Sequence, residues 1–255
     1  MCVFLCCVEK KEEYLIIRME NKVYSWKEIV TGIKSPYNTY VFVSMRNSGK
    51  SKSVRNLVVE LLREIPHHNI ILFSTTAHRE LNDDYKFLQD SKYAKIYPGS
   101  KDEIDLHIDD ILKHCRDMKK KNIDYSLMVI FDDIDVTKRN DKVAELFTQG
   151  RHYNISVIVS SQNAAYFLDP TKRSNIDYLA FRKVENTYKK TLWNMCNTKM
   201  KFEEFKDFIN DNTTDYKFIL YDNTSQSQNE DERLKVVKAV LYDEMKVGTK
   251  KERKK

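Results

Sequence analysis

The sequence predicts an α/β fold in which a mostly parallel central sheet is flanked by helices. Short β-prone runs alternate along the chain with segments of helical periodicity, which is the order typical of βα units. The run Leu127–Phe131 is apolar without interruption, as expected of a strand buried on both faces. The chain has 255 residues, of which 41% are hydrophobic, enough for one such domain with appendages.

The first half of the predicted core contains two more strands and two long helices. The β-prone run Tyr40–Val43 precedes a helix over Ser51–Glu64, in which valines and leucines recur every three or four residues. The strand Asn69–Ser74 comes next. A second helix is predicted over Asp102–Lys121, because its apolar residues share one face: Ile104, Ile108, Ile111, Leu112 and Cys115. This helix precedes the apolar strand.

The second half continues the alternation. A helix over Asp141–Gly150 leads to the strand Ile155–Val159. The remaining core elements are strands at Ile176–Phe181 and Lys217–Tyr221, with helices around Glu185–Met195 and Phe202–Ile209 between them. Asn223–Glu232 is polar and predicts a loop. A final amphipathic helix is expected after it, with one apolar side made by Leu234, Val237, Val240 and Leu241. We therefore expect an appendage at 1–35, a core at 36–222 and a C-terminal segment at 223–255.

Composition excludes several classes of protein. Only 5 Gly and 4 Pro, with 32% charged residues, exclude collagen-like and wholly disordered chains. No apolar run reaches the ~18 residues that a membrane-spanning helix needs, so membrane contact is not supported. The apolar stretch Met1–Val8 lacks the basic lead of a signal peptide and predicts a small strand or packing tail. The five cysteines have no paired CxxC spacing, which favours free thiols in a reducing compartment over a zinc or disulfide framework.

The excess positive charge lies at one end of the chain. The net charge is +6, and residues 233–255 contain nine basic and three acidic side chains, which leaves residues 1–232 neutral. The last six residues, Lys250–Lys255, form a basic tail. Such a tail either binds a polyanion through phosphate contacts or only keeps the terminus solvated.

The segment Ser44–Ser51, with the sequence SMRNSGKS, lies between the first strand and the first helix. This strand–loop–helix context is what a phosphate-binding loop requires. Gly49 lets the backbone approach the phosphates, Lys50 reaches the outer ones, and the Ser51 hydroxyl is a ligand for Mg²⁺. Ser44 stands where the motif usually has glycine. The nucleotide-binding residues expected are Asn47, Ser48, Gly49, Lys50, Ser51 and Lys52.

A pair of carboxylates, Asp132 and Asp133, follows the apolar strand. The carboxyl ends of parallel strands meet at one edge of the sheet, so this pair should face the phosphate loop. We assign Asp132, with Ser51, to Mg²⁺ and Asp133 to the attacking water. Taken alone, two carboxylates at this position are equally consistent with a loop cap.

Polar side chains near the next strand complete the candidate site. Gln162 follows that strand and is expected to sense the terminal phosphate and position water. Arg151 precedes the strand and is a candidate to neutralise transition-state charge, in its own or a neighbouring subunit; Arg173 is a second candidate. The predicted catalytic residues are thus Lys50, Asp133, Gln162 and Arg151.

The motifs NSGKS, VIFDD and GRHYNISVIVSSQ, in this order, resemble the FtsK–HerA superfamily of ATPases. The resemblance runs from about Tyr40 to Tyr221 and is closest to the DNA packaging ATPases of poxviruses, giant viruses and their virophages. It implies a three-layer P-loop NTPase fold of the additional-strand, RecA-like type. It also implies ATP and Mg²⁺ as cofactors and hydrolysis coupled to movement along double-stranded DNA. Ser44 and Asp133 depart from the family pattern, in which the second acidic residue is often glutamate.

The resemblance further implies a homo-oligomeric ring, a hexamer or a pentamer, in which the arginine, carried over to Arg151, acts across subunits. Capsid or portal-vertex proteins would be partners, and the virion or host cytoplasm the place of action. The residues leave other functions open: another nucleic-acid translocase or helicase, a small-molecule kinase, or a nucleotide-binding module without activity. The chain has no clear kinase lid, and intact Lys50, Asp132 and Asp133 argue against an inactive module.

Overall fold

The computed structural model describes residues 22–65, 69–77, 83–89, 91–134, 142–162, 170–227 and 229–240. The apolar stretch Met1–Val8 and the basic tail Lys250–Lys255 lie outside these ranges. No helix within them is long and apolar enough to cross a membrane.

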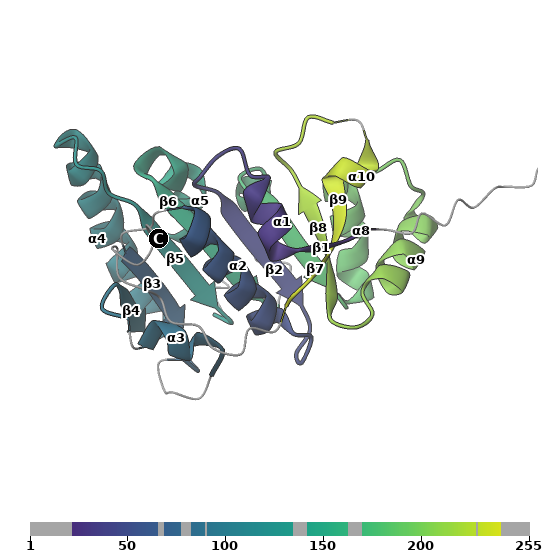
Figure 1. Cartoon of the computed structure of the whole chain (residues 1–255), viewed down its shortest axis with the longest axis horizontal. Helices are drawn as coiled ribbons and strands as arrows, with labels where there is room; N and C mark the ends of the chain where they lie inside the picture. Colours follow the sequence, from purple (N-terminus) through teal and green to yellow (C-terminus); the bar gives the residue numbers. More distant parts are fainter. Residues whose placement is uncertain are drawn as a thin grey trace, which may run out of the picture.

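The described strands form one nine-stranded sheet in the order β1-β9-β8-β7-β2-β6-β5-β3-β4 (Figure 1). Every neighbouring pair is parallel except the two that involve β8, which runs antiparallel to β7 and to β9. The predicted mostly parallel sheet is therefore confirmed. The strands are β1 Val23–Ser25, β2 Thr39–Ser44, β3 Asn69–Ser74, β4 Ala94–Tyr97, β5 Leu127–Asp132, β6 Ile155–Ser161, β7 Tyr178–Arg182, β8 Lys217–Asp222 and β9 Leu234–Lys238.

Helices cover both faces of the sheet and make three layers. The described helices are α1 Trp26–Thr31, α2 Lys50–Glu64, α3 Lys86–Gln89, α4 Lys101–Lys120, α5 Val143–Gln149, α7 Pro170–Arg173, α8 Asn186–Cys196, α9 Phe202–Asn212 and α10 Glu230–Arg233, with short 3-10 turns at Asp83–Tyr85 and Gly150–Tyr153. One core packs α1, α2 and α3 against one face, and a second core packs α4, α5, α8 and α9 against the other. Alternate residues of β2 enter the two cores, Tyr40 and Phe42 on one side, Val41 and Val43 on the other.

The C-terminal amphipathic helix is a wrong prediction: Leu234–Lys238 is the strand β9. The spacing of Leu234 and Val237 resembles one side of a helix, but Val236 is buried as well. β9 lies between β1 and β8, which pair with both of its edges, while Leu234 and Val237 enter the cores on opposite faces of the sheet. Adjacent buried valines therefore suit a strand in that position. The segments predicted to flank the core thus contribute β1 and β9 to the same sheet.

The topology brings the ends of four central strands to one edge of the sheet. The registers pair Phe42 with Ser160, Asp132 with Ser160, and Ser44 with Arg182. Because β8 runs in the opposite direction, its first residues meet this same edge. Ligand sites of open α/β sheets lie at the carboxyl ends of the strands, so a ligand site is expected at this edge.

Candidate nucleotide-binding site

The loop between β2 and α2 is shaped to bind phosphate. Asn47 and Gly49 have positive φ angles of 55° and 81°, and Gly49 immediately precedes the first helical residue, Lys50. Left-handed residues in such a loop turn backbone N–H groups toward one concave side, to which the N-terminus of α2 adds its own. The hydroxyls of Ser44 and Ser48 lie 2.5 Å apart and are buried. The serine at the usual glycine position therefore closes the base of the loop with a hydrogen bond.

Lys50 is a buried cation without a hydrogen-bond partner among the described residues. It is 8% exposed, and its Nζ lies 3.6 Å from Oδ1 of Asp133, beyond hydrogen-bond distance. Burial lowers the pKa of Lys50, and the negative charges of Asp133 and Asp132 offset part of that shift. The ion pair with Asp133 compensates part of the cost of burying this ammonium, but its N–H groups have no acceptor among the described residues, so Lys50 is suited to an anionic ligand on the loop.

Asp132, the last residue of β5, is also a buried side chain with an atom that lacks a hydrogen-bond partner in the described part of the chain. It is 2% exposed, and its Oδ1 has no hydrogen-bond partner among the described residues. Burial raises the pKa of Asp132, against the opposing effects of Ser160, Lys50 and Tyr85. Carboxylate and hydroxyl oxygens are the ligands that Mg²⁺ takes in nucleotide sites. Asp132 and the half-buried Ser51 therefore fit a bound Mg²⁺.

Asp133 and Gln162 meet through paired hydrogen bonds. Nε2 of Gln162 donates to both carboxylate oxygens of Asp133, at 2.7 and 2.6 Å. Asp133 has a positive φ of 50°, and its backbone N–H donates to the carbonyl of Ser160 at 2.9 Å. Nε of Arg46 donates to Oε1 of Gln162 at 3.2 Å. The structure thus brings Lys50, Asp132, Asp133 and Gln162 together, as the sequence predicts, and adds Arg46 to them.

The comparisons with known proteins agree with this geometry. Residues 31–234 match the family model described as "Poxvirus A32 protein". The chain belongs to the poxvirus A32 protein family. It is a P-loop ATPase of the FtsK–HerA superfamily, and the predicted resemblance is confirmed. A curated relative, "Uncharacterized protein 075L" of Invertebrate iridescent virus 6, is 36% identical over 87 residues, so that the match spans only 33% of either chain.

Solved structures share the fold of this A32-family chain. The genome packaging NTPase B204 of Sulfolobus turreted icosahedral virus 2, in complex with ATP-gammaS, has a TM-score of 0.54 and 18% identity. That match covers 81% of this chain and all of B204. The pCW3 conjugation coupling protein TcpA has a TM-score of 0.55 and 11% identity, over 81% of this chain and 61% of TcpA. EssC of Geobacillus thermodenitrificans has a TM-score of 0.52 and 12% identity, over 83% of this chain and 42% of EssC.

Arg151 lies away from the phosphate loop of its own chain. It is in the turn before β6, whereas Gln162 follows β6, and seven residues of strand span about 20 Å. Its Nη2 lies 3.5 Å from Oδ1 of Asp177, whose other oxygen accepts the backbone N–H of Thr39 at 2.8 Å. Arg173 ends α7, ahead of β7. A role for Arg151 in its own site is therefore not supported, and a role in the site of a neighbouring subunit stays a prediction.

The sequence did not identify two residues that β7 and β8 bring to the phosphate loop of this A32-family chain, Arg182 and Tyr216. Arg182 ends β7, is 2% exposed, and donates to the backbone carbonyls of Ser48 and Thr213, the latter at 2.8 Å. Burial lowers the pKa of Arg182. Its guanidinium lies over the ring of Tyr216, 5.1 Å from the centroid. Arg182 is the polar residue at the end of an apolar strand, as Asp132 is, and this position in the sequence could have identified it as a site residue. No pattern in the neighbouring sequence identifies Tyr216.

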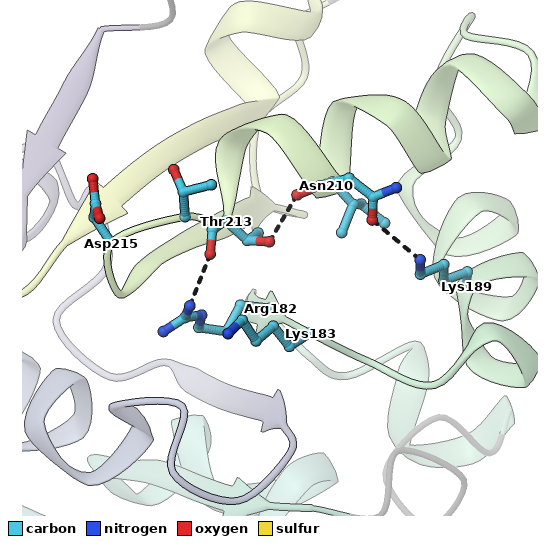
Figure 2. A pocket seen from close by; sticks show the side chains of 8 residues that line it. Arg182, Lys183, Lys189, Asn210, Thr213 and Asp215 are labelled. Carbon is cyan, nitrogen blue, oxygen red and sulfur yellow. Dashed lines mark hydrogen bonds between the residues drawn. The ribbon is translucent and has the colours of Figure 1, made fainter.

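A basic pocket of roughly 400 Å³ opens beside these residues (Figure 2). Figure 2 shows Arg182 directed toward the carbonyl of Thr213 and Lys189 toward Asn210, with hydrogen bonds of 2.8 and 3.3 Å. Its lining is Arg182, Lys183, Lys189, Ile209, Asn210, Thr213, Thr214 and Asp215. Arg182 is therefore shared between this pocket and the phosphate loop.

Proposed function

We propose that the chain hydrolyses Mg²⁺-ATP and uses the energy to move double-stranded DNA into a viral capsid. One observation carries the hydrolytic part of the proposal: Lys50 and Asp132 are buried beside the loop, each with a polar atom that has no hydrogen-bond partner among the described residues. Buried polar atoms are normally satisfied. A triphosphate for Lys50 and a divalent cation for Asp132 would satisfy both.

Each residue then has a chemical role. The loop N–H groups and Lys50 bind the phosphates, and Ser51 and Asp132 hold the metal. Mg²⁺, when bound, neutralises charge on the phosphate oxygens. Asp133 accepts the proton of the attacking water, and Gln162 positions that water or senses the terminal phosphate. Gln162 donates one hydrogen bond to each oxygen of Asp133 in this structure, which leaves the carboxylate further lone pairs to accept a proton from water.

The DNA-moving part of the proposal is supported by the family and by the fold shared with B204, a genome packaging NTPase. It includes a homo-oligomeric ring of five or six subunits, capsid or portal-vertex partners, and action at the viral assembly site, in the virion or host cytoplasm. Its test is ATP turnover with and without duplex DNA, run beside a sizing measurement. Stimulation by duplex DNA is expected. An ATP turnover rate that is the same with and without duplex DNA would favour a small-molecule kinase or another enzyme that acts on a soluble substrate.

Substitution of Asp132 and of Asp133 by asparagine should have different effects on ATP binding and on hydrolysis. Asp133→Asn should retain Mg²⁺-ATP binding and slow hydrolysis by about 10²-fold or more, because an amide cannot accept a proton. Asp132→Asn should weaken the Mg²⁺-dependent part of binding as well. Calorimetry with and without Mg²⁺, beside turnover, measures both. Normal hydrolysis by both variants would leave the pair as a loop cap.

The pH dependence of the metal site follows from Asp132. Its pKa is raised by burial above the ordinary 3.8, and Mg²⁺ binds only the carboxylate form. On acidification, Mg²⁺-dependent binding should therefore weaken at a higher pH than an exposed aspartate would give. In Asp132→Asn this component of the pH profile should be absent.

The basic tail should matter for DNA and not for ATP. Deletion of Lys250–Lys255 removes five positive charges and one negative charge. Each lost phosphate contact should reduce the magnitude of the slope of log affinity against log salt by about 0.9 on duplex DNA. DNA affinity measured over a range of salt concentrations tests this. An unchanged slope and affinity would mean that the tail makes no contact with DNA.

A further inference from the structure

Tyr216 is an exposed aromatic residue at the phosphate loop. It is 60% exposed, although it immediately precedes β8, a strand of the central sheet. A Cβ added to Gly49 would lie 2.8 Å from Cδ1 of Tyr216, so the ring packs directly on the loop where glycine leaves room. Exposed aromatic rings near a phosphate site are suited to stacking on a nucleobase, because every base has an aromatic face.

The backbone holds this ring in place at a conformational cost. Asp215 and Tyr216 have consecutive positive φ angles of 48° and 59°. Non-glycine residues adopt this region at an energetic cost, which persists where the surroundings enforce the conformation. Here the N–H of Lys217 donates to the carbonyl of Thr214 at 2.9 Å, and Arg182 bonds the carbonyl of Thr213. Two strained residues and a buried arginine thus present one exposed ring.

The strand order places this ring at the nucleoside end of a bound nucleotide. Asp133 and Gln162, which act at the terminal phosphate, come from β5 and β6 on one side of β2. Tyr216 and Arg182 come from β8 and β7 on the other side. A triphosphate whose terminal phosphate faces β6 must direct its sugar and base toward β7 and β8.

We propose that Tyr216 is the stacking platform for the base of the bound nucleotide and that this stack makes the site prefer a purine to a pyrimidine. Purines have the larger aromatic surface and gain most from stacking. Arg182, over the ring and bonded to the carbonyl of Ser48, fixes the platform relative to the loop. The inference rests on the proposed function, since it requires the triphosphate to lie on this loop.

The test compares a ligand that has a base with one that has none. Wild type, Tyr216→Leu and Tyr216→Phe are titrated by calorimetry with ATP and with inorganic tripolyphosphate, both with Mg²⁺. Tyr216→Leu should weaken ATP binding by about 5- to 150-fold, the range for loss of one base–aromatic stack, and leave tripolyphosphate binding unchanged. Tyr216→Phe keeps the ring and should bind both ligands as the wild type does. Wild type should bind CTP more weakly than ATP, and Tyr216→Leu should reduce that preference.

Other outcomes would overturn the inference in distinguishable ways. An equal loss for ATP and tripolyphosphate in Tyr216→Leu would mean that the ring only supports the loop. Unchanged affinity for both ligands would mean that the base lies elsewhere. In either case the proposed function survives if Lys50→Ala still weakens tripolyphosphate. If the wild type binds neither ligand, or Lys50→Ala changes neither, the nucleotide site itself is wrong and this inference fails with it.

Discussion

Lys50→Ala should reduce ATP turnover by on the order of a hundredfold or more. The ammonium lies at the base of the loop, 8% exposed, and no other described residue hydrogen-bonds it. Asp133 is an ion-pair partner 3.6 Å away, but the N–H groups of Lys50 are available to phosphate oxygens, where such contacts contribute several kcal/mol in the transition state. Steady-state turnover at saturating Mg²⁺-ATP measures the effect.

The variant should remain folded. Because burial lowers the pKa of Lys50, the charged side chain does not stabilise the ligand-free protein, and its loss should shift the midpoint of thermal unfolding by only a few degrees. Lys120→Ala is the matched control, since Lys120 is exposed near the end of α4, away from the loop. Turnover close to wild type in Lys50→Ala, with normal turnover in Lys120→Ala, would end the phosphate-loop assignment.

Arg151→Ala should keep ATP binding and lose about 10³–10⁵-fold in turnover, the range known for arginine fingers. The structure places Arg151 at the edge of the sheet opposite the loop of its own chain, 44% exposed at the side chain. A catalytic role for Arg151 therefore requires the site of a neighbouring subunit. Its ion pair joins a half-exposed guanidinium to the buried Asp177 at 3.5 Å, and Asp177 keeps its hydrogen bond from the N–H of Thr39 when the arginine is removed, so little stability depends on the pair. The midpoint of thermal unfolding should therefore change little, and Arg173→Ala is the comparison that separates the two candidates.

Mixing the inactive variants tests whether catalysis is shared. When Arg151→Ala and Lys50→Ala chains assemble together, some interfaces place an intact Arg151 against an intact loop. Activity should return at those interfaces and depend on the mixing ratio. If sizing shows that the chains co-assemble and no activity returns, the finger does not act across subunits.

Local sequence signals were sufficient for most of the fold and the centre of the site. The apolar run Leu127–Phe131 predicted a buried strand because it is short and lies in a chain whose apolar runs alternate with helical patterns. Periodicity predicted α2 and α4 to within a few residues. Gly49 and Lys50 between a strand and a helix predicted the loop, because the phosphate contacts come from consecutive backbone groups. Asp133 and Gln162 were predicted to lie at one site because parallel strands end at one edge, and the structure adds a hydrogen bond between their side chains.

Tertiary structure alone decided the remainder. Leu234–Lys238 has a spacing compatible with a helix, and its pairing with β8 and β1 made it a strand. The contact of Arg46 with Gln162 depends on the register of β2 against β6. Tyr216 reaches Gly49 only because β8 runs antiparallel to β7 and starts at the edge where β2 ends. The sequence by itself determined most elements and the motifs, because these depend on residues that are neighbours in the chain. The pairing of strands that are distant in the chain depends on the packing of the whole sheet, and no local sequence pattern specifies it.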